Sequence, residues 1–437
     1  MREPLLRITK QSQVKIFCSS VGRQISKVNP PNQKPFIAIA CGGTGGHLFP
    51  GIAIAEQLQA RGCDVALLIS PKEVDQQAVK SAVGLQVFTL PAVGLQNRNY
   101  FSFAKSFWSS FRAARKIFRQ HPPAAVLAMG GFTSVPPVLA AKKFHAQTFL
   151  HESNTIPGKS NRLLARFVDE AFVGFPECSA RLRAQNISVT GTPVRPQFDA
   201  ARLNPRAARA ALGLEADLPT LLVVGGSQGA SGLNHLILSA LPLLAKKNWQ
   251  WLHLSGPHDF EKVKAVYPAL GIRAVVKSFL AEMELALGAA TACLSRSGAS
   301  SLAEMAAMRL PAALVPLPTS ADHHQMTNAL ALVRTGAAKL LEQKTSTPEQ
   351  VAALIAELVG NETVRAQMQA ALAQWHAPHA AAGIAEAILQ RIEFPAPISR
   401  ETSSSPHETA TIQAILGIIL PLCLWHLELA TGSTSIS

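Results

Sequence analysis

Short apolar runs alternate with amphipathic segments along most of the chain, and glycine-rich or polar loops separate them. The first clear run, Phe36–Ala40, has the length of a buried strand and is followed by a glycine-rich loop. A helix is then predicted from about Pro50, which suits a first helical position, to a stop at Gly62. Because the apolar run Val65–Ile69 comes next, this order predicts a βαβ unit.

The same order recurs further along the chain. Residues 124–131 and 148–154 each combine an apolar strand with a polar or glycine-containing loop, and the pattern starts again after Gly191. There, a strand at 220–224 and a second glycine loop precede apolar residues at helical spacing, which are Leu233, Ile237, Leu241 and Leu244. The strand in "WLHLSG" closes a second βαβ unit. We therefore expect an α/β protein with two tandem Rossmann-like domains facing a cleft, with ligands at the carboxyl ends of the strands.

The chain divides into four predicted segments. They are a basic extension (1–34), a first Rossmann-like domain (35–195), a second (196–393), and a linker with an apolar tail (394–437). The first segment lacks the continuous apolar core of a signal peptide. The apolar run at 412–425 is interrupted by Pro421 and falls short of the roughly 18 residues of a membrane span, so a packed or interfacial helix is favoured.

Composition and charge add little to this division. Of the 437 residues, 48% are apolar and 16% charged, which supports a large folded core. The net charge of +14 favours polyanionic partners but does not choose among nucleic acid, anionic lipid and phosphorylated substrates. The six cysteines form no CxxC pair, which favours free thiols in a reducing compartment such as the cytosol.

Each glycine loop lies between a strand and a helix, where backbone N–H groups can approach an anion, although a tight turn is the alternative for either loop alone. A dinucleotide oxidoreductase is disfavoured, because "GGTGGH" does not match G-x-G-x-x-G and Ser70 stands where an acidic residue is expected. There is also no G-x-x-x-x-G-K-[ST] motif. Because the sequence has no Asp-x-Asp pair and "DHHQ" lacks a neighbouring third zinc ligand, we predict no metal and no cofactor.

Two further loops carry candidate chemistry. In "SRSGASSLAEMAA", small residues precede a predicted helix, and Glu304 lies in the first turns of that helix. Its carboxylate can accept both hydroxyls of a ribose, or it can simply interact favourably with the helix dipole. In "HESN", residues 151–154, four polar side chains end a buried strand. Such clusters are more often sites than accidents. A diphosphate bound near these loops would be neutralised by backbone dipoles and basic side chains.

Seven ordered motifs resemble the MurG family of peptidoglycan glycosyltransferases, over about Phe36 to Ile392. They are "GGTGGHLFPGIAIAEQL", "MGGFTSVPPVLAA", "HESNTIPGKSNRLLARF", "GTPVR", "VVGGSQGASGLN", "SRSGASSLAEMAA" and "DHHQMTNA". The resemblance implies the GT-B architecture and inverting transfer of GlcNAc from UDP-GlcNAc to undecaprenyl-pyrophosphoryl-MurNAc-pentapeptide (lipid I), giving lipid II. It also implies a peripheral protein on the cytoplasmic face of the inner membrane, with no bound metal and no nucleic-acid partner.

The resemblance further implies a set of donor contacts. Those to the transferring sugar are Thr44, Gly45, Gly46, Asn154 and Gln325. Those to the uridine diphosphate are Arg195, Ser227, Leu280, Ala299, Ser300, Ser301, Leu302, Ala303 and Glu304, with Leu280 on the uracil through its backbone and Glu304 on the ribose. The chain departs from the common family pattern at Ser153, at His323, and at Ser300 and Ser301.

The transfer requires a base that takes the proton from the acceptor's C4 hydroxyl. His47 is the leading candidate, because it ends the first glycine loop and titrates near neutral pH. Glu152 is the second candidate. A capping or packing role for His47 is the alternative.

Residues 99–120 have the composition of an interfacial amphipathic helix attracted to an anionic membrane surface. The segment mixes Tyr100, Phe101, Phe103, Phe107, Trp108 and Phe111 with Lys105, Arg112, Arg115, Lys116 and Arg119. A helix that packs its aromatic side chains in the core is the alternative.

Three other functions share part of this pattern. They are a same-fold glycosyltransferase acting on another lipid, such as a diacylglycerol galactosyltransferase, a UDP-GlcNAc 2-epimerase, and a noncatalytic lipid-binding protein. An epimerase has no need of a membrane-facing aromatic and basic segment. An assay for UDP release in the presence of a lipid acceptor distinguishes the transferase from the epimerase.

Overall fold

The computed structural model describes residues 34–43, 45–79, 82, 84–92, 100–201, 203–226 and 229–393. The predictions for the basic extension at 1–33, for the segment at 394–437, and for Thr44 and Ser227 lie outside these residues. Within the described part of the chain, no helix is long and apolar enough to cross a membrane.

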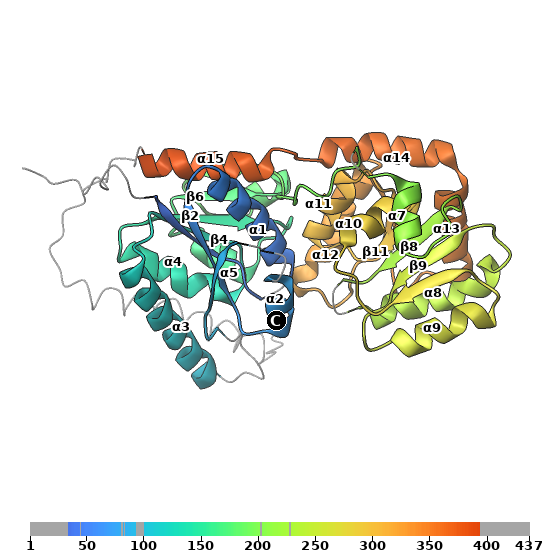
Figure 1. The fold of residues 1–437 in the computed structure, drawn as a ribbon, viewed down its shortest axis with the longest axis horizontal. Coiled ribbons are helices and arrows are strands. Elements are labelled where there is room, and N and C mark those ends of the chain that lie inside the picture. Colours follow the sequence, from blue (N-terminus) through green and yellow to red (C-terminus); the bar gives the residue numbers. More distant parts are fainter. Residues whose placement is uncertain are drawn as a thin grey trace, which may run out of the picture. The chain divides into compact units, whose positions relative to one another are not determined.

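The first domain is built on a seven-stranded sheet in which every pair of neighbouring strands is parallel (Figure 1). In sheet order the strands are β3 (Gln86–Thr89), β2 (Asp64–Ile69), β1 (Phe36–Ala40), β4 (Ala125–Ala128), β5 (Gln147–Glu152), β6 (Glu170–Val173) and β7 (Ile187–Val189). The connecting helices are α1 (Gly45–Ala60), α2 (Glu73–Ala78), α3 (Tyr100–Gln120), α4 (Val135–Lys142), α5 (Lys159–Leu164) and α6 (Pro176–Ser179).

The second domain repeats this plan with a six-stranded parallel sheet. Its order is β10 (Ala274–Lys277), β9 (Gln250–Leu254), β8 (Thr220–Val224), β11 (Ala292–Ser295), β12 (Ala312–Leu314) and β13 (Ala338–Leu340). Its helices are α7 (Pro205–Ala211), α8 (Ser231–Leu244), α9 (Phe260–Ala269), α10 (Met283–Ala289), α11 (Ala299–Ala307), α12 (His324–Arg334), α13 (Pro348–Gly360) and α14 (Glu362–Trp375), and the chain then continues into α15 (Ala380–Glu393). In both sheets the chain order is that of a Rossmann fold, so the predicted fold class is confirmed.

Alternation along the central strands explains why both faces of each sheet are covered. In β1, Ile37 and Ile39 face the layer that contains α1, whereas Ala38 and Ala40 face the layer that contains α3 and α4. Strand β8 divides its side chains in the same way between two further clusters. A strand buried on both faces reads as a continuous apolar run, which is why these strands could be located in the sequence.

Helix α1 begins at Gly45, so the predicted start near Pro50 is wrong. A proline inside a helix has no N–H for the carbonyl four residues earlier, which here belongs to Gly46. The Ser300 hydroxyl, from the second domain, donates a hydrogen bond to that carbonyl at 2.9 Å. The helix therefore continues through Pro50 while its first turn remains part of the glycine loop.

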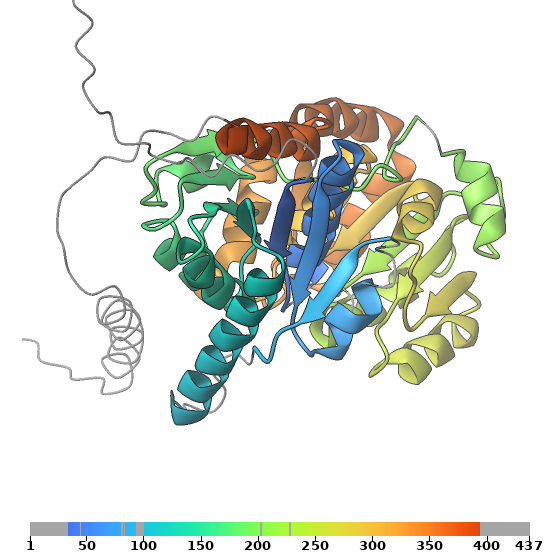
Figure 2. The same ribbon diagram turned by 60° about the vertical axis from the view of Figure 1, so that its left-hand side comes forward.

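Helix α15 departs from the expected division of the chain, which assigned residues up to 393 to the second domain. Its side chains Ile384, Ala385 and Ile388 are buried in the cluster that contains Ile37 and Ile39 of β1. In Figures 1 and 2, α15 runs beside α1 over the first sheet. The end of the chain's described part thus completes the first domain, because the α1 face of that sheet needs a second helix to cover it.

Helix α3 forms where the amphipathic segment was predicted, but most of its described aromatic side chains pack inward. Phe103, Phe107, Phe111 and Phe118 are buried, so the core-packing alternative holds for them. Trp108 is exposed, and the Arg112 guanidinium lies 5.3 Å from the centroid of its ring. The opposite face presents exposed basic side chains, which are Lys105, Arg112, Lys116 and Arg119.

Candidate active site

A cavity of about 1180 Å³ lies between the two sheets, at the carboxyl ends of their strands. It is lined from both domains, as expected for a ligand site in a doubly wound fold. Most of the predicted site residues meet in it. They are Gly45, Gly46, His47, Glu152, Asn154, Arg195, Leu280, Ala299, Ser300, Ser301, Glu304 and Gln325.

The amino end of α11 forms one wall of this cavity. Gly298 precedes the helix, and the cavity is lined by the next three residues, Ala299 to Ser301. The first N–H groups of a helix have no acceptor within it, so they are available to an anion at the positive end of the helix dipole. This arrangement favours a phosphate group at the second-domain side of the cavity.

Two predicted residues of the same helix do not reach the cavity. The Leu302 side chain is buried in the core, and its N–H donates to the Gly298 carbonyl at 3.0 Å. Ala303 is half-buried but does not line the cavity. Neither residue lines the cavity in this structure, and the donor contacts predicted for them stay predictions.

Glu304 and Arg195 both line the cavity, and the charge of Arg195 influences the Glu304 carboxyl. Desolvation raises the pKa of the Glu304 carboxyl to about 7, and the Arg195 charge acts in the opposite direction. Arg195 is buried, with its guanidinium 4.3 Å from the centroid of the Phe49 ring and its Nε without a hydrogen-bond partner. A carboxylate that ionises near neutral pH can accept hydroxyl groups of a ligand, and the guanidinium is held in place to meet an anion.

His47 lies on the first-domain side of the cavity, in the first turn of α1. Its ring packs against Gly130, where an added Cβ would lie only 2.8 Å from the His47 Cε1 atom and where φ is +118°. Desolvation lowers the pKa of His47, although the nearby Glu152 and Asp75 charges oppose this. The imidazole is therefore neutral at pH 7, in the form that can accept a proton.

The first glycine loop is partly occupied by a carboxylate of the chain itself. The Gly43 N–H donates to Asp75 Oδ2 at 2.6 Å, and the buried Asp75 also accepts the Ser70 hydroxyl. Consequently, an external anion at this loop has to use the N–H groups of the α1 start, at Gly45 and Gly46, rather than that of Gly43.

Glu152 is buried at the end of β5, and its carboxylate accepts four hydrogen bonds. Oε1 accepts from the Asn154 N–H at 2.8 Å and from Asn154 Nδ2 at 2.9 Å. Oε2 accepts from the Gly158 N–H at 2.8 Å and from Asn161 Nδ2 at 3.0 Å. Since a carboxylate has about four acceptor positions, this set favours a role in holding the loop 153–161 over a role as proton acceptor.

Gln325 and Leu280 reach the cavity from the second domain. The Gln325 Oε1 atom accepts the Leu317 N–H at 2.9 Å, so its amide nitrogen is the part left to donate to a ligand. Leu280 is buried on the core side, which leaves its backbone for contact with a ligand.

Several residues around the cavity were not singled out from the sequence. Phe49 supports Arg195, Asn161 supports Glu152, and Asn328 contacts Asn154 across the domain boundary at 3.0 Å. Asn328 falls three residues after Gln325 on α12, so helical spacing on one face was the signal that could have identified it. Among the residues that the structure describes, no three His, Cys, Asp or Glu side chains gather to hold a metal ion.

Comparison with known protein families supports the two-domain fold described above. Residues 37–173 match the glycosyltransferase family 28 N-terminal domain, and residues 220–386 match the glycosyltransferase family 28 C-terminal domain. The UDP-N-acetylglucosamine–N-acetylmuramyl-(pentapeptide) pyrophosphoryl-undecaprenol N-acetylglucosamine transferase of Anaeromyxobacter sp. (strain Fw109-5) is 35% identical over 372 residues, covering 83% of this chain and 96% of that protein.

Solved structures point the same way. Acinetobacter baumannii MurG is 28% identical, with a TM-score of 0.64 over 82% of this chain and 100% of that one. A UDP-N-acetylglucosamine 2-epimerase is 13% identical, with a TM-score of 0.62 over 86% of this chain and 100% of that one, and this likeness shows the fold alone. The sequence identity, the paired family 28 domains and the shared architecture together establish that the chain belongs to the MurG family of glycosyltransferases.

Proposed function

We propose that this protein transfers GlcNAc from UDP-GlcNAc to the C4 hydroxyl of MurNAc in undecaprenyl-pyrophosphoryl-MurNAc-pentapeptide, with inversion at the anomeric carbon and without a metal. One observation carries the proposal. The cavity brings together an α11 amino end for a diphosphate, a carboxylate suited to a ribose, and a neutral imidazole on the facing domain.

Donor recognition follows from the chemistry of each wall. The N–H groups of residues 299–301 and the Arg195 guanidinium take the diphosphate, and Glu304 accepts the ribose hydroxyls. Asn154 and the free amide nitrogen of Gln325 contact the sugar hydroxyls. A site with such polar groups discriminates against a sugar that leaves them unpaired, because an unpaired buried donor or acceptor costs about 1–3 kcal/mol.

In the transfer itself, His47 accepts the proton of the acceptor's C4 hydroxyl while the oxygen of that hydroxyl bonds to the anomeric carbon. The bond from that carbon to the diphosphate oxygen breaks at the same time. The electron pair leaves with UDP, whose charge the α11 amino end and Arg195 stabilise. Glu152 positions the loop that presents Asn154, rather than acting on the proton.

Donor affinity should depend on pH through Glu304. Because the raised pKa of about 7 belongs to the free protein and the ribose hydroxyls need the ionised carboxylate, UDP affinity should fall as pH drops below 7. The expected slope is about tenfold per pH unit over the first units, since one proton must be displaced. Titration calorimetry with UDP between pH 5.5 and 8.5 measures this. The Glu304→Gln variant separates the effect of the Glu304 carboxyl from titration of the diphosphate. If UDP affinity fell equally steeply with pH in that variant, Glu304 would not be the titrating group.

We also propose that the protein is peripheral on the cytoplasmic face of the membrane, where the basic face of α3 meets anionic lipid. The acceptor is a membrane lipid, and four exposed basic side chains share this helix. The exposed Trp108 provides an amphipathic ring at the same place.

Charge reversal on α3 tests this surface. The double variant Arg112→Glu/Lys116→Glu should bind anionic vesicles at least tenfold more weakly, as each basic residue near such a surface contributes about 1 kcal/mol. Both residues are exposed, whereas Arg115 is half-buried over Phe111 and is left unchanged. Lys246→Glu/Lys247→Glu on the second domain is the matched control. Equal co-sedimentation of both double variants would exclude α3 as the contact surface.

The competing functions predict different products. Incubation with labelled UDP-GlcNAc and a lipid-linked MurNAc acceptor should give labelled lipid and UDP, with little competition from UDP-GalNAc or UDP-glucose. Transfer only to another lipid, such as diacylglycerol, would instead support the same-fold alternative.

A further inference from the structure

Asp75 is a fully buried carboxylate that does not line the cavity, and neither the donor contacts nor the proton transfer proposed above includes it. It lies in the first turn of α2, which follows β2. Its Oδ2 atom accepts the Gly43 N–H at 2.6 Å, the Ser70 N–H at 3.3 Å and the Ser70 hydroxyl. Through these hydrogen bonds, Asp75 ties the first glycine loop to the end of β2.

The backbone of the loop is shaped to reach this carboxylate. A Cβ added at Gly42 would lie 2.4 Å from the Ser70 nitrogen, so a side chain there would collide with the end of β2. Gly43 has a φ of +115°, which favours glycine, and its N–H donates to Asp75. Helix α1 begins two residues later, and His47 lies in its first turn. The position of the loop therefore sets the position of the imidazole.

Little else fixes the His47 ring. Its Nδ1 atom is buried and makes no hydrogen bond within the part of the chain that the structure describes. The ring packs against Gly130, where an added Cβ would lie 3.0 Å from that Nδ1 atom. The place of the imidazole thus depends on this packing and on the loop that Asp75 holds.

A positive charge forms in this buried place when His47 takes a proton. Desolvation opposes that charge and lowers the pKa of His47, and the neighbouring His324 acts in the same direction. The Glu152 and Asp75 carboxylates favour the charge. His151, which also lies near the ring, is neutral at pH 7 because burial lowers its pKa to about 4. The two carboxylates are therefore the groups that can stabilise an imidazolium here.

Two further titratable groups lie close to Asp75. The Cys41 thiol is neutral, because burial and the Asp75 charge both raise its pKa. Lys72 is exposed, and its Nζ donates to the Gly43 carbonyl at 3.4 Å. Since this Lys72 contact is to the backbone rather than to the carboxylate, the negative charge of Asp75 stays available to His47.

We propose that Asp75 is a positioning residue for the transfer: it holds the first glycine loop where His47 meets the acceptor hydroxyl, and its carboxylate provides the counter-charge for the imidazolium that forms. This inference rests on the proposed function, in which His47 takes the acceptor's proton. Because Asp75 does not line the cavity, it acts through the loop and through its charge, not by contact with a substrate. A fixed negative charge of this kind stabilises the positive charge that develops during the reaction.

The Asp75→Asn variant removes the charge but keeps the hydrogen bonds. The Gly43 and Ser70 N–H groups can only donate, so the new amide oxygen must take the place of Oδ2. The NH₂ group then takes the place of Oδ1, which has no hydrogen-bond partner among the described residues. This variant therefore tests the counter-charge with the loop still held.

The measurement is kcat between pH 5 and 8.5, with saturating UDP-GlcNAc and a lipid-linked MurNAc acceptor. Without the carboxylate the imidazolium is less stable, so the midpoint of the acid limb of kcat should move lower by at least about half a pH unit. A weaker base also removes the proton less readily, so kcat on the neutral plateau should fall roughly three- to tenfold. Loss of folded protein would lower kcat without moving the limb. An unchanged pH profile would contradict the counter-charge.

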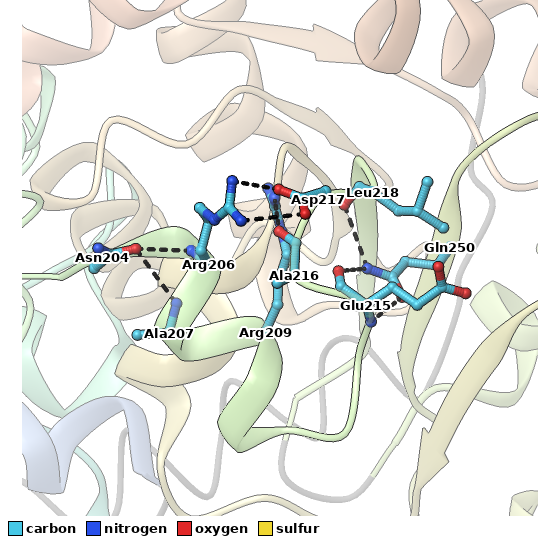
Figure 3. A network of polar contacts seen from close by, with 9 residues as sticks. All are labelled: Asn204, Arg206, Ala207, Arg209, Glu215, Ala216, Asp217, Leu218 and Gln250. Carbon is cyan, nitrogen blue, oxygen red and sulfur yellow. Dashed lines mark hydrogen bonds and ion pairs between the residues drawn. The ribbon is translucent and has the colours of Figure 1, made fainter.

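Asp217→Asn is the control for net charge. Asp217 accepts a hydrogen bond from Arg206 Nη2 at 3.2 Å (Figure 3). It precedes β8 and so lies at the amino ends of the strands, whereas the cavity lies at their carboxyl ends. This variant should keep both the acid limb and the plateau. If it moved the limb as far as Asp75→Asn does, the effect would come from net charge and not from Asp75.

A pair of glycine variants tests the loop itself and stays informative if Asp75→Asn does not fold. Gly43→Ala strains the backbone at the N–H that meets Asp75, and Gly62→Ala does so at the end of α1, where φ is +85°. At both positions an added Cβ meets no described atom within 4 Å. Both variants should lose similar stability, but only Gly43→Ala should lower kcat, by at least about tenfold, because the base is misplaced. Equal kcat in the two variants would contradict the positioning role.

A double variant shows whether Asp75 acts through His47. In a His47→Ala background, Asp75→Asn should change the remaining turnover less than about twofold, because the group that it supports is absent. Losses that add in the double variant would contradict action through His47.

The outcomes separate this proposal from the one it rests on. Wild-type protein that transfers no GlcNAc to the lipid-linked acceptor would overturn the proposed function, and a His47→Ala variant with full turnover would overturn the base assignment; either result removes the role of Asp75 as well. Active wild-type protein and inactive His47→Ala, together with a wild-type pH profile in Asp75→Asn and equal kcat in Gly43→Ala and Gly62→Ala, would overturn the role of Asp75 alone.

Discussion

Replacement of His47 by alanine is expected to lower kcat by about a hundredfold to ten-thousandfold, with little change in KM for UDP-GlcNAc. The imidazole lines the cavity in its neutral form, and loss of a general base typically costs this much. Because desolvation lowers the pKa of His47, the wild-type kcat should fall only on the acid side of neutrality, as the ring becomes protonated. Steady-state kinetics across pH, with a lipid-linked MurNAc acceptor, would show that acid limb disappear in the variant.

His253→Gln is the matched control for this substitution. His253 is also buried, and its Nδ1 and Nε2 contact the Tyr267 hydroxyl at 2.8 Å and Asn234 Oδ1 at 3.0 Å. Its loss should lower stability but leave kcat within a few-fold of the wild type. If His47→Ala kept full turnover, His47 would have no part in proton transfer and its ring would serve only to pack against Gly130.

Replacement of Glu152 by glutamine is expected to destabilise the protein by about 2–4 kcal/mol and to raise KM for UDP-GlcNAc at least tenfold. Whichever way the new amide faces, its NH₂ group meets two donors that previously had an acceptor, and each unpaired buried group costs about 1–3 kcal/mol. Depending on that orientation, either Asn154 or Asn161 would lose its acceptor, so the loop that presents Asn154 would shift. Thermal unfolding and steady-state kinetics measure the two effects.

Glu170→Gln controls for loss of a buried carboxylate in the same sheet. Glu170 begins β6, away from the cavity, where it accepts the Ser188 hydroxyl at 2.7 Å and pairs with Arg391 at 3.5 Å. This variant should lose less stability and keep its KM. A Glu152→Gln protein with unchanged stability and KM but greatly reduced kcat would contradict the positioning role and restore Glu152 as the base.

Much of the fold could be predicted from the sequence because its strands are buried on both faces. Phe36–Ala40 and Thr220–Val224 form the strands expected for them, since a continuous apolar run bounded by glycine has few other structures available. Apolar periodicity could not assign α15 to a domain. An apolar stripe indicates that a helix packs against a core but not which one, and α15 packs on the first sheet. The start of α1 was missed because a local rule for proline ignored a partner from the other domain, Ser300.

The site was predictable to the extent that motifs lie at strand ends. His47, Asn154 and Glu304 leave different strands, and the parallel topology brings them to one cavity. The sequence could not predict which of the side chains around the cavity contact one another. The four donors around Glu152 and the contact of Asn328 with Asn154 depend on how the loops and domains meet, which no local pattern encodes.

The product that the full chain forms from labelled UDP-GlcNAc and a lipid-linked MurNAc acceptor decides whether the protein catalyses the proposed transfer. We expect one β-linked GlcNAc on the acceptor's C4 hydroxyl for each UDP released, and no turnover of the donor when the acceptor is omitted. Conversion of UDP-GlcNAc to its 2-epimer without acceptor, or release of UDP with no labelled lipid, would contradict it.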